Sequence, residues 1–335
     1  MTITAKVIAK SRSPYHTMGA PDIVTFLLRY PRFIHAEVMT HRVFSRNASS
    51  SRAIPVKRLI QDVIDDTAMP IHWGKNQPGM QADEQHSQRV LTTSIHPGFN
   101  HPKAGQVPIS MSSTDAWNEA RDRAIDMARA FDEAGYHKQI VNRMLEPFSH
   151  INVVVTATNY DNFYWLRRHR DAQPEIKALA DAMFTADMAE EPRMLKDEEW
   201  HLPFITEEDR HRDYPVQDGF GQIEYVPVDE FDLLKVSTAR CARTSYMTHD
   251  GRVPVFDEDL KLYRRLVGSE PLHASPTEHQ AKNDQPLWGE NYIFWEAPSM
   301  SGNLDEGWIQ FRKTLLRENC TDYTAWIAET LEDKT

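Results

Sequence analysis

The chain has 335 residues, of which 40% are hydrophobic and 26% are charged, and its formal net charge is -11. Such a chain can bury a large core in one domain or two. Its net acidity argues against duplex nucleic acid as the main partner, because binding to duplex nucleic acid needs lysine and arginine over a wide face. Two cysteines exclude a disulfide scaffold and favour a reduced, cytoplasmic compartment, and we expect neither a signal peptide nor a membrane span, because no apolar run approaches the required length.

The N-terminal part predicts a strand followed by two helices. Residues 24–30 are rich in β-formers and stop at a proline, which indicates a strand. A helix over 33–41 is expected next, carrying His41 at its C-terminal end. A serine-rich loop follows, and a short helix is predicted over 56–66.

The middle of the chain begins with a loop. Residues 69–110 are rich in turn-forming residues, and we interpret them as a structural loop or, alternatively, as a lid or substrate contact. Ser112 and Asp115 have capping-box spacing and predict the start of a long amphipathic helix that stops at Gly135. The remaining predictions here are helices over 137–145, 161–168 and 174–188 and a buried strand over 151–158.

The C-terminal part is predicted to form a second lobe. Residues 190–230 are acidic and weakly periodic, which indicates a connection. Beyond it we expect a helix over 257–267, a loop leading into a helix over 273–283, and a helix over 307–319. The expected fold class is α/β (α+β), a mixed sheet flanked by helices, divided into a lobe 1–190, an acidic linker 191–225 and a C-terminal lobe 226–335.

One stretch concentrates positive charge and hydroxyl groups. Between residues 38 and 61 there are five cationic side chains and no carboxylate. Such a cluster suits a small anion such as a phosphate, because arginine makes fork-like, charge-assisted hydrogen bonds. A solvated basic turn is the alternative. The side chains in question are Arg42, Arg46, Arg52, Lys57 and Arg58, with Ser45, Ser49, Ser50 and Ser51 among them.

The order of residues in this stretch resembles the signature of the flavin-dependent thymidylate synthases (ThyX). That family carries Arg-His-Arg, seven further residues and a serine, within a longer Ser-x-Asn-Glu-x-Ser-x-Arg pattern. The positions that match are His41, Arg42, Ser45, Asn47, Ser50 and Arg52. Thr40 stands where the family has its first arginine, and Ala48 stands where it has the glutamate.

Further matches lie downstream. Residues 143–147 and 151–159 are similar to the family's Arg-x-x-x-Pro, strand and asparagine element, and 162–167 to its Asn-Phe-x-x-Leu-Arg piece. Asp161 replaces an expected arginine. Two segments, 239–246 and 273–279, resemble elements that lie upstream of the signature in ordinary members, so we interpret the chain as a permuted or partly duplicated relative.

The resemblance implies an enzyme that methylates a pyrimidine nucleotide at C5. It would bind FAD and convert dUMP to dTMP, with methylenetetrahydrofolate as the one-carbon donor and NADPH as the reductant. It would also be a homo-oligomer, a dimer or a tetramer. A dCMP-directed variant, a pyrimidine C5 hydroxymethylase and a non-catalytic nucleotide-binding relative remain alternatives, because Thr40, Ala48 and Asp161 depart from the family pattern.

The resemblance also implies site residues. The implied catalytic residues are Arg143 and Arg167, which would stabilise charge at the pyrimidine C2 carbonyl, and Ser50. Ser50 has no base positioned by sequence, so nucleotide binding is its preferred role. The cofactor-binding set is His41, Arg42, Asn47, Asn159, Asn162, His273 and Ser275. The substrate-binding set is Glu37, Ser49, Ser50, Ser51, Arg52, Arg143 and Arg167.

Some of these residues have plainer interpretations. His41 and Arg42 could simply cap a helix, because cations are favoured at its C-terminal end. His273, Glu278 and His279 are residue types that bind metals, but the spacing of the two histidines and the proline between them do not suit one helix face. We therefore expect no metal.

Overall fold

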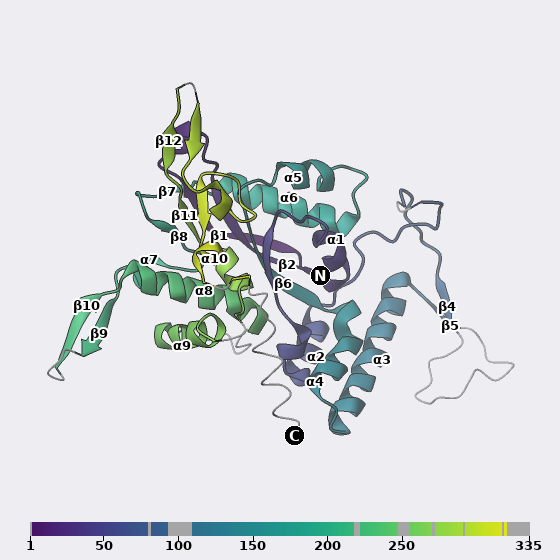
Figure 1. Cartoon of the computed structure of the whole chain (residues 1–335). Helices are drawn as coiled ribbons and strands as arrows, with labels where there is room; N and C mark the ends of the chain where they lie inside the picture. Colours follow the sequence, from purple (N-terminus) through teal and green to yellow (C-terminus); the bar gives the residue numbers. More distant parts are fainter. Residues whose placement is uncertain are drawn as a thin grey trace, which may run out of the picture.

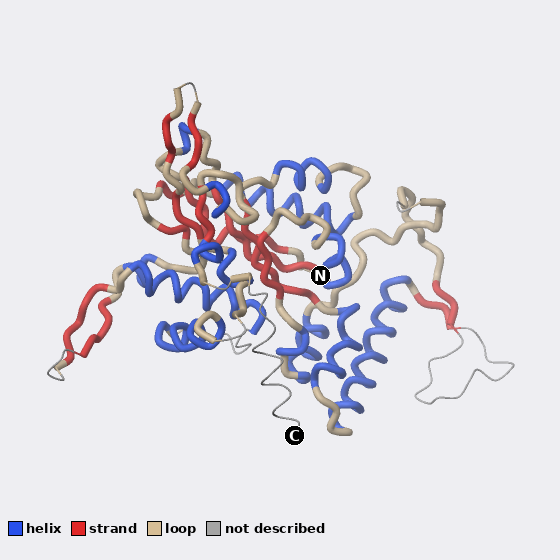
Figure 2. Tube along the Cα trace, viewed as in Figure 1, coloured by secondary structure: helices blue, strands red, loops and turns tan. Residues whose placement is uncertain are grey.

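The structure is a computed structural model of the chain. It describes residues 2–79, 82–92, 109–217, 222–246, 255–269, 272–290, 292–316 and 318–319. These residues form a mixed α/β fold, in which a central sheet has helices on both faces, a helical subdomain lies at one end and hairpins project from the body (Figure 1, Figure 2).

The central sheet has five strands in the order β3-β6-β2-β1-β7. Neighbouring strands are antiparallel except for β1 and β7, which are parallel. The predicted strands 24–30 and 151–158 are confirmed as β2 and β6, to within a residue at each end. The strands are β1 (Thr4–Arg12), β2 (Ile23–Pro31), β3 (Ser45–Ala48), β6 (His150–Ala157) and β7 (Arg193–Met194).

One face of the sheet is covered by α5 (Asp161–Arg167) and α6 (Pro174–Ala189), which confirm two predicted helices. Successive strand residues point to opposite faces, so alternate residues of β2 and β6 reach this side. They form a fully buried core with α6, made of Phe26, Leu28, Tyr30, Val153, Val155, Ile176, Leu179 and Met183.

The other face is covered by elements from the C-terminal part of the chain. The polar residues Thr25 and Thr156 point to this side and contact His201 and His279. A three-stranded sheet in the order β14-β11-β8 lies here. The covering elements are α8 (Glu230–Tyr246), η5 (Ser275–Glu278), β8 (Trp200–His201), β11 (Ala281–Asn283) and β14 (Trp308–Gln310).

A helical subdomain packs around its own core (Figure 1). The Ser112 hydroxyl accepts a hydrogen bond from the Asp115 backbone, and Gly135 has a φ of +83°, so the predicted start and stop of the long helix are confirmed. The members are α2 (Val56–Asp65), α3 (Ser113–Glu133), α4 (Lys138–Val141) and the 3-10 helix η4 (Asn142–Phe148).

The remaining elements are short, apart from α9, which confirms the predicted helix 257–267. The helices are η1 (His16–Met18), η2 (Arg32–Ile34), α1 (His35–Val38), η3 (Ser51–Ala53), α7 (Glu207–Arg210), α9 (Phe256–Leu266), η6 (Pro298–Met300) and α10 (Phe311–Thr314). The hairpins are β4 (Val90–Thr92) with β5 (Ile109–Met111), β9 (Asp213–Gln217) with β10 (Ile223–Pro227), and β12 (Pro286–Trp288) with β13 (Ile293–Trp295).

Two helix predictions in the N-terminal half are corrected. The helix 33–41 ends at Val38, because the Thr40 hydroxyl donates to the Glu37 carbonyl and Arg46 donates to the carbonyl oxygens that follow. The helix 137–145 tightens into 3-10 geometry after Val141. The side chain of Asn142 donates there to two backbone carbonyls of the neighbouring loop.

Two predictions in the C-terminal half are also corrected. The expected helix in 273–283 is a 3-10 turn followed by β11, whose backbone pairs with strands on both sides. The segment 307–319 begins with β14 rather than with a helix, because its backbone pairs with β11. Residues 190–230 contain β7, β8, α7 and a hairpin. Of the loop predicted over 69–110, residues 80–81 and 93–108 lie outside the described residues.

Among the helices that the structure describes, none combines the length and the apolar character that crossing a membrane requires.

Candidate functional site

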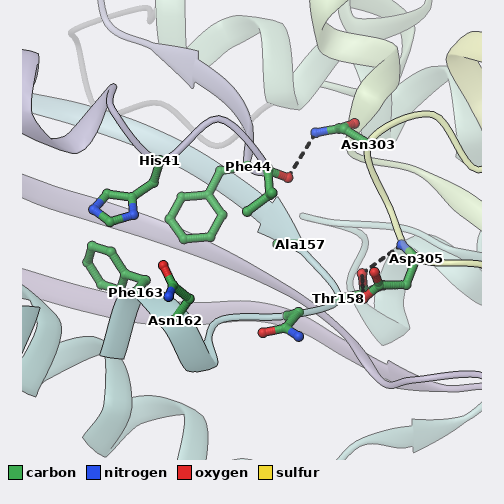
Figure 3. Close-up of a pocket in the computed structure, with 10 residues that line it drawn as sticks. His41, Phe44, Ala157, Thr158, Asn162, Phe163, Asn303 and Asp305 are labelled. Carbon is green, nitrogen blue, oxygen red and sulfur yellow. Dashed lines mark hydrogen bonds between the residues drawn. The ribbon is translucent and has the colours of Figure 1, made fainter. Parts of the chain in front are cut away.

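A pocket of about 230 Å³ opens where β6 ends and α5 begins (Figure 3). Three segments that are far apart in sequence supply its walls: the turn before β3, the end of β6 with the start of α5, and a loop before β14. Its lining residues are His41, Val43, Phe44, Ala157, Thr158, Asn159, Asn162, Phe163, Asn303 and Asp305.

Aromatic rings form one wall of the pocket. The rings of His41 and Phe163 meet edge to face with centroids 4.9 Å apart, and Phe44 and Phe163 do so at 5.5 Å. His41 is stacked against Phe44 at 5.9 Å. Figure 3 shows these three rings at one end of the pocket, with the Asn162 amide beside them. A wall of aromatic and apolar groups with a few amides suits a planar heterocyclic ligand.

His41 is held as a neutral imidazole. Its Nε2 atom accepts a hydrogen bond of 2.9 Å from the Nε–H of Arg167, so Nδ1 carries the ring proton. Burial is the largest cause that lowers the pKa of His41 to about 4, and the charges of Arg167 and Arg46 contribute to the same shift. Arg46 also donates to the carbonyl oxygens of Met39 and His41, and thereby fixes the turn that carries the imidazole.

The amide of Asn159 shapes the start of α5. Its Oδ1 accepts a hydrogen bond of 2.9 Å from the backbone of Asp161, which keeps the side chain at the pocket wall. Asn162 lies on the first turn of the same helix and is exposed at the pocket. Of the predicted cofactor-binding residues, His41, Asn159 and Asn162 therefore come together here, and Arg167 joins them through His41.

A second cluster lies around Glu146. Ser51 donates to the Glu146 carboxylate over 2.6 Å, and Arg143 approaches it at 3.3 Å. Arg32 is half-buried beside them, and this burial lowers its pKa while the charge of Glu146 raises it. The motifs in the sequence did not indicate a role for Arg32 or Glu146, although Glu146 lies three residues after Arg143 in the matched motif.

Arg143 and Arg167 belong to different clusters. Arg143 contacts Glu146, whereas Arg167 contacts His41 and Thr40, and the side-chain bonds of the described residues do not link the two groups. The predicted substrate residue Ser49 is buried, and its hydroxyl accepts from the backbone of Asn152.

Other predicted residues are exposed or buried away from the pocket. Arg42, Glu37 and Arg52 are exposed, and Ser50 is half-buried at the start of a 3-10 turn. Asn47 is buried, and its amide donates to the backbone oxygen of Cys241, which joins β3 to α8.

The C-terminal residues that line the pocket differ from those predicted to bind the cofactor. His273 and Ser275 are exposed near η5 and do not line the pocket. Asn303 and Asp305 line it instead, and no motif in the sequence singled them out. His279 is fully buried against Thr156. Within the described residues, no group of three or more histidine, cysteine, aspartate and glutamate side chains is arranged to hold a metal ion.

Comparison with known proteins identifies the family. The sequence model of the family described as "Thymidylate synthase complementing protein" (Thy1) matches residues 20–193, just over half of the chain. No curated protein matches the chain.

Solved structures similar to this chain include two of the UMP/dUMP methylase PolB from Streptomyces cacaoi. The one bound with 5-Br dUMP has 19% identity and a TM-score of 0.37, and the similarity covers 58% of this chain and 91% of that chain. The one bound with 5-Br UMP has 19% identity, a TM-score of 0.36 and coverages of 58% and 90%. ThyX from Helicobacter pylori, complexed with FAD and dUMP, has 16% identity, a TM-score of 0.30 and coverages of 49% and 67%. The family match confirms the resemblance seen in the signature: the chain belongs to the Thy1 family, that of the flavin-dependent thymidylate synthases (ThyX).

Proposed function

We propose that the protein is a flavin-dependent methyltransferase that converts dUMP to dTMP. The observation that carries this proposal is the convergence of three matched motif segments on one pocket. His41 of the signature, Asn159 after the strand motif and Asn162 of the following motif all line it. His41 is separated from Asn159 and Asn162 by more than a hundred positions in the sequence, so motif similarity and spatial proximity support the same site.

The residues of the pocket fit a flavin ring. Its aromatic wall of His41, Phe44 and Phe163 can pack on a planar ring system, and the amides of Asn159 and Asn162 can pair with the polar ring edge. FAD bound here would supply the hydride that completes the methyl group, with NADPH as the reductant.

The chain's own residues would orient the groups at the pocket and supply positive charge there. Arg167 holds the neutral imidazole of His41 in place, and its guanidinium adds positive charge at that end of the pocket. Positive charge near a developing negative charge lowers the barrier of the step that creates it.

We place the nucleotide at the Glu146 cluster and its surroundings. Ser50 and Arg52 would bind the phosphate, because an exposed guanidinium and a hydroxyl offer hydrogen-bond donors to its oxygens. Arg143 would stabilise charge at the C2 carbonyl of the base, and its contact with Glu146 orients the guanidinium. Pyrimidine C5 would then bond to the methylene carbon of methylenetetrahydrofolate and lose its proton. The bond between that carbon and the folate nitrogen would break, which releases tetrahydrofolate, and the hydride would add to the transferred carbon to complete the methyl group.

We further propose that the active form is a homo-oligomer, a dimer or a tetramer. The pocket and the Glu146 cluster are separate within one chain, and association would allow the pocket of one subunit to meet the cluster of another. The lobe 226–335 would serve to complete the pocket, because Asn303 and Asp305 come from it.

The visible absorption spectrum of the purified protein tests the cofactor, since bound flavin has characteristic bands. Incubation with dUMP, labelled methylenetetrahydrofolate and NADPH should release the C5 hydrogen and transfer the label to the base. The mass of the product distinguishes a methyl from a hydroxymethyl group. A parallel reaction with dCMP tests the other base. This second reaction matters because Ala48 stands where the family has a glutamate. A colourless protein that does not bind added FAD would refute the proposal.

A further inference from the structure

The loop between Gly302 and Gly307 completes the pocket from outside the family-matched region. The family match ends at residue 193, yet Asn303 and Asp305 line the same pocket as His41. Figure 3 shows Asp305 at the end of the pocket opposite His41, with Asn303 on the same side as Asp305. This part of the wall is therefore a feature of this chain beyond the matched family region.

Hydrogen bonds attach the loop to both neighbouring walls. Asn303 donates from Nδ2 to the backbone oxygen of Val43 over 3.1 Å, and its Oδ1 accepts from Ser45 at 3.0 Å. The carboxylate of Asp305 accepts from the Thr158 hydroxyl at 2.9 Å, and the Asp305 backbone donates to the same hydroxyl at 3.0 Å. The loop is thus tied to the turn before β3 and to the end of β6.

The two glycines and Gln310 keep the loop in this conformation. Gly302 has a φ of +68°, and a Cβ atom there would collide with the Gln310 side chain, whose amide donates to Asn303 over 2.7 Å. Gly307 has a φ of +97°, and its Cβ would lie 2.8 Å from that of Ala20. Such backbone angles favour glycine. The hydrogen bonds of Asn303 and Asp305 hold the two side chains in place on the resulting loop.

The polar atoms of Asn303 and Asp305 have hydrogen-bonding capacity that their bonds to the described residues fill only in part. Asp305 Oδ2 accepts from Thr158, whereas Oδ1 has no donor among the described residues. The Asn303 amide group has two N–H donors, and one of them bonds to Val43. The loop therefore offers one hydrogen-bond acceptor and one donor to a ligand. The acceptor carries negative charge, which favours an N–H group and disfavours a phosphate.

The two ends of the pocket also differ in charge. At the His41 end, the guanidinium of Arg167 provides positive charge. At the other end, the Asp305 carboxylate provides negative charge (Figure 3). A ligand that fits this arrangement has an N–H donor beside an acceptor on one ring edge and electron-rich atoms toward the arginine.

We propose that Asp305 and Asn303 determine ligand specificity in this pocket by binding the N–H-bearing edge of a planar heteroaromatic ring. This inference rests on the proposed function, because FAD carries two rings with such an edge. The amino group and ring nitrogen of adenine present a donor beside an acceptor. The imide N–H and carbonyl of the isoalloxazine present the same pattern, so separate ligands must distinguish the two.

The test compares Asp305→Asn with a matched control, Glu306→Gln, which alters the neighbouring exposed carboxylate outside the pocket lining. The asparagine retains an oxygen that can accept from Thr158 but removes the negative charge. Affinities for FAD and riboflavin are measured by flavin fluorescence, and affinity for adenosine by calorimetry. Thermal melting of each variant reports on folding.

We expect Asp305→Asn to weaken FAD binding about tenfold, because a hydrogen bond to a charged group is lost, while Glu306→Gln has no effect. A parallel loss for riboflavin assigns the edge to the isoalloxazine, and a parallel loss for adenosine assigns it to adenine. Unchanged FAD affinity in Asp305→Asn would overturn the inference. An equal loss for all three ligands together with a lower melting temperature would do the same, because it indicates a purely structural role.

Failure of the proposed function has a different signature. Wild-type protein that binds no FAD would overturn the proposed function and remove the basis of this inference with it. If the wild-type protein binds FAD, and the Asp305→Asn variant binds it equally tightly, only the inference is overturned.

Discussion

Arg167 donates a hydrogen bond from Nε to the Nε2 atom of His41 over 2.9 Å, although the two residues lie 126 positions apart. A guanidinium has no acceptor atom, so the imidazole must accept and must be neutral. Edge-to-face contact with Phe163 restricts the same imidazole from another side. The pairing sets the protonation state of the ring that forms the pocket wall.

Replacing Arg167 with alanine should raise the pKa of His41 from about 4 toward its ordinary value of 6.5. The rise should be incomplete, because burial is the largest cause of the depression and Arg46 also contributes. An NMR titration of the His41 ring protons measures the shift. Arg170→Ala is the control, since the Arg170 side chain is 89% exposed and should leave the titration unchanged. An unaltered His41 pKa in Arg167→Ala would contradict the pairing.

The free energy of unfolding should begin to decrease with falling pH at a pH above the range in which carboxylates titrate. His201 and His279 are fully buried and are linked through hydroxyl hydrogen bonds of 2.8, 2.7 and 2.8 Å by Thr25 and Thr156. Burial lowers the pKa of each histidine from 6.5 to about 3. The unfolded chain therefore takes up protons below pH 6.5 while the folded chain does not, so the stabilising contribution present above pH 6.5 is lost as the pH falls toward 3.

Urea unfolding at a series of pH values tests this prediction. The free energy of unfolding should decrease by up to about 1.4 kcal/mol per pH unit for each of the two histidines below their unfolded pKa. His211→Gln, which alters an exposed side chain, should reproduce the wild-type curve. Equal stability at neutral pH and at about pH 5 would show that the two imidazoles become protonated in the folded state.

Substitutions of Ser51 and Ser50 should have different effects, the first on stability and the second on nucleotide binding. Ser51 is 4% exposed and donates to Glu146, so Ser51→Ala should lower the free energy of unfolding by about 1 kcal/mol. Ser50 is half-buried and carries a proposed nucleotide contact, so Ser50→Ala should weaken dUMP binding and leave stability unchanged. Chemical denaturation and calorimetric titration with dUMP measure the two effects. The assignment fails if both variants affect only stability.

Arg52 should contribute to nucleotide affinity and little to folding. Its side chain is exposed, and it makes no ion pair within the part of the chain that the structure describes. Arg52→Ala should weaken dUMP binding about tenfold, because a charge-assisted bond to a phosphate is lost. Arg58→Ala provides the control, since Arg58 is an exposed arginine of the same stretch that pairs with Asp62. Unchanged dUMP affinity in Arg52→Ala would remove Arg52 from the site.

Local patterns in the sequence were sufficient for the long elements and for the family. Ser112 and Gly135 marked the ends of a helix because capping depends on neighbouring residues alone. The buried strands β2 and β6 were predictable because apolar β-formers run without interruption between turn signals. The family signature around His41 could be recognised because it is defined by the spacing of residues, and this spacing is a property of the sequence itself.

Short elements of the C-terminal part were not predictable in this way. Residues 281–283 and 308–310 become strands because they pair with each other, and those pairing partners are distant in sequence. Asn303 and Asp305 lie in the pocket, and His273 lies outside it, for the same kind of reason. The path of the chain across the second face of the sheet decides their positions.

The family, the principal strands and helices, and the residues with suitable chemistry could all be inferred from the order of residues along the chain. The pairs that come into contact follow from the folded chain alone: His41 with Arg167, Ser51 with Glu146, and Asp305 with Thr158. The physical reason is that periodicity, capping and motif spacing act over a few residues, whereas a pocket wall depends on sheet pairing and side-chain packing between distant segments.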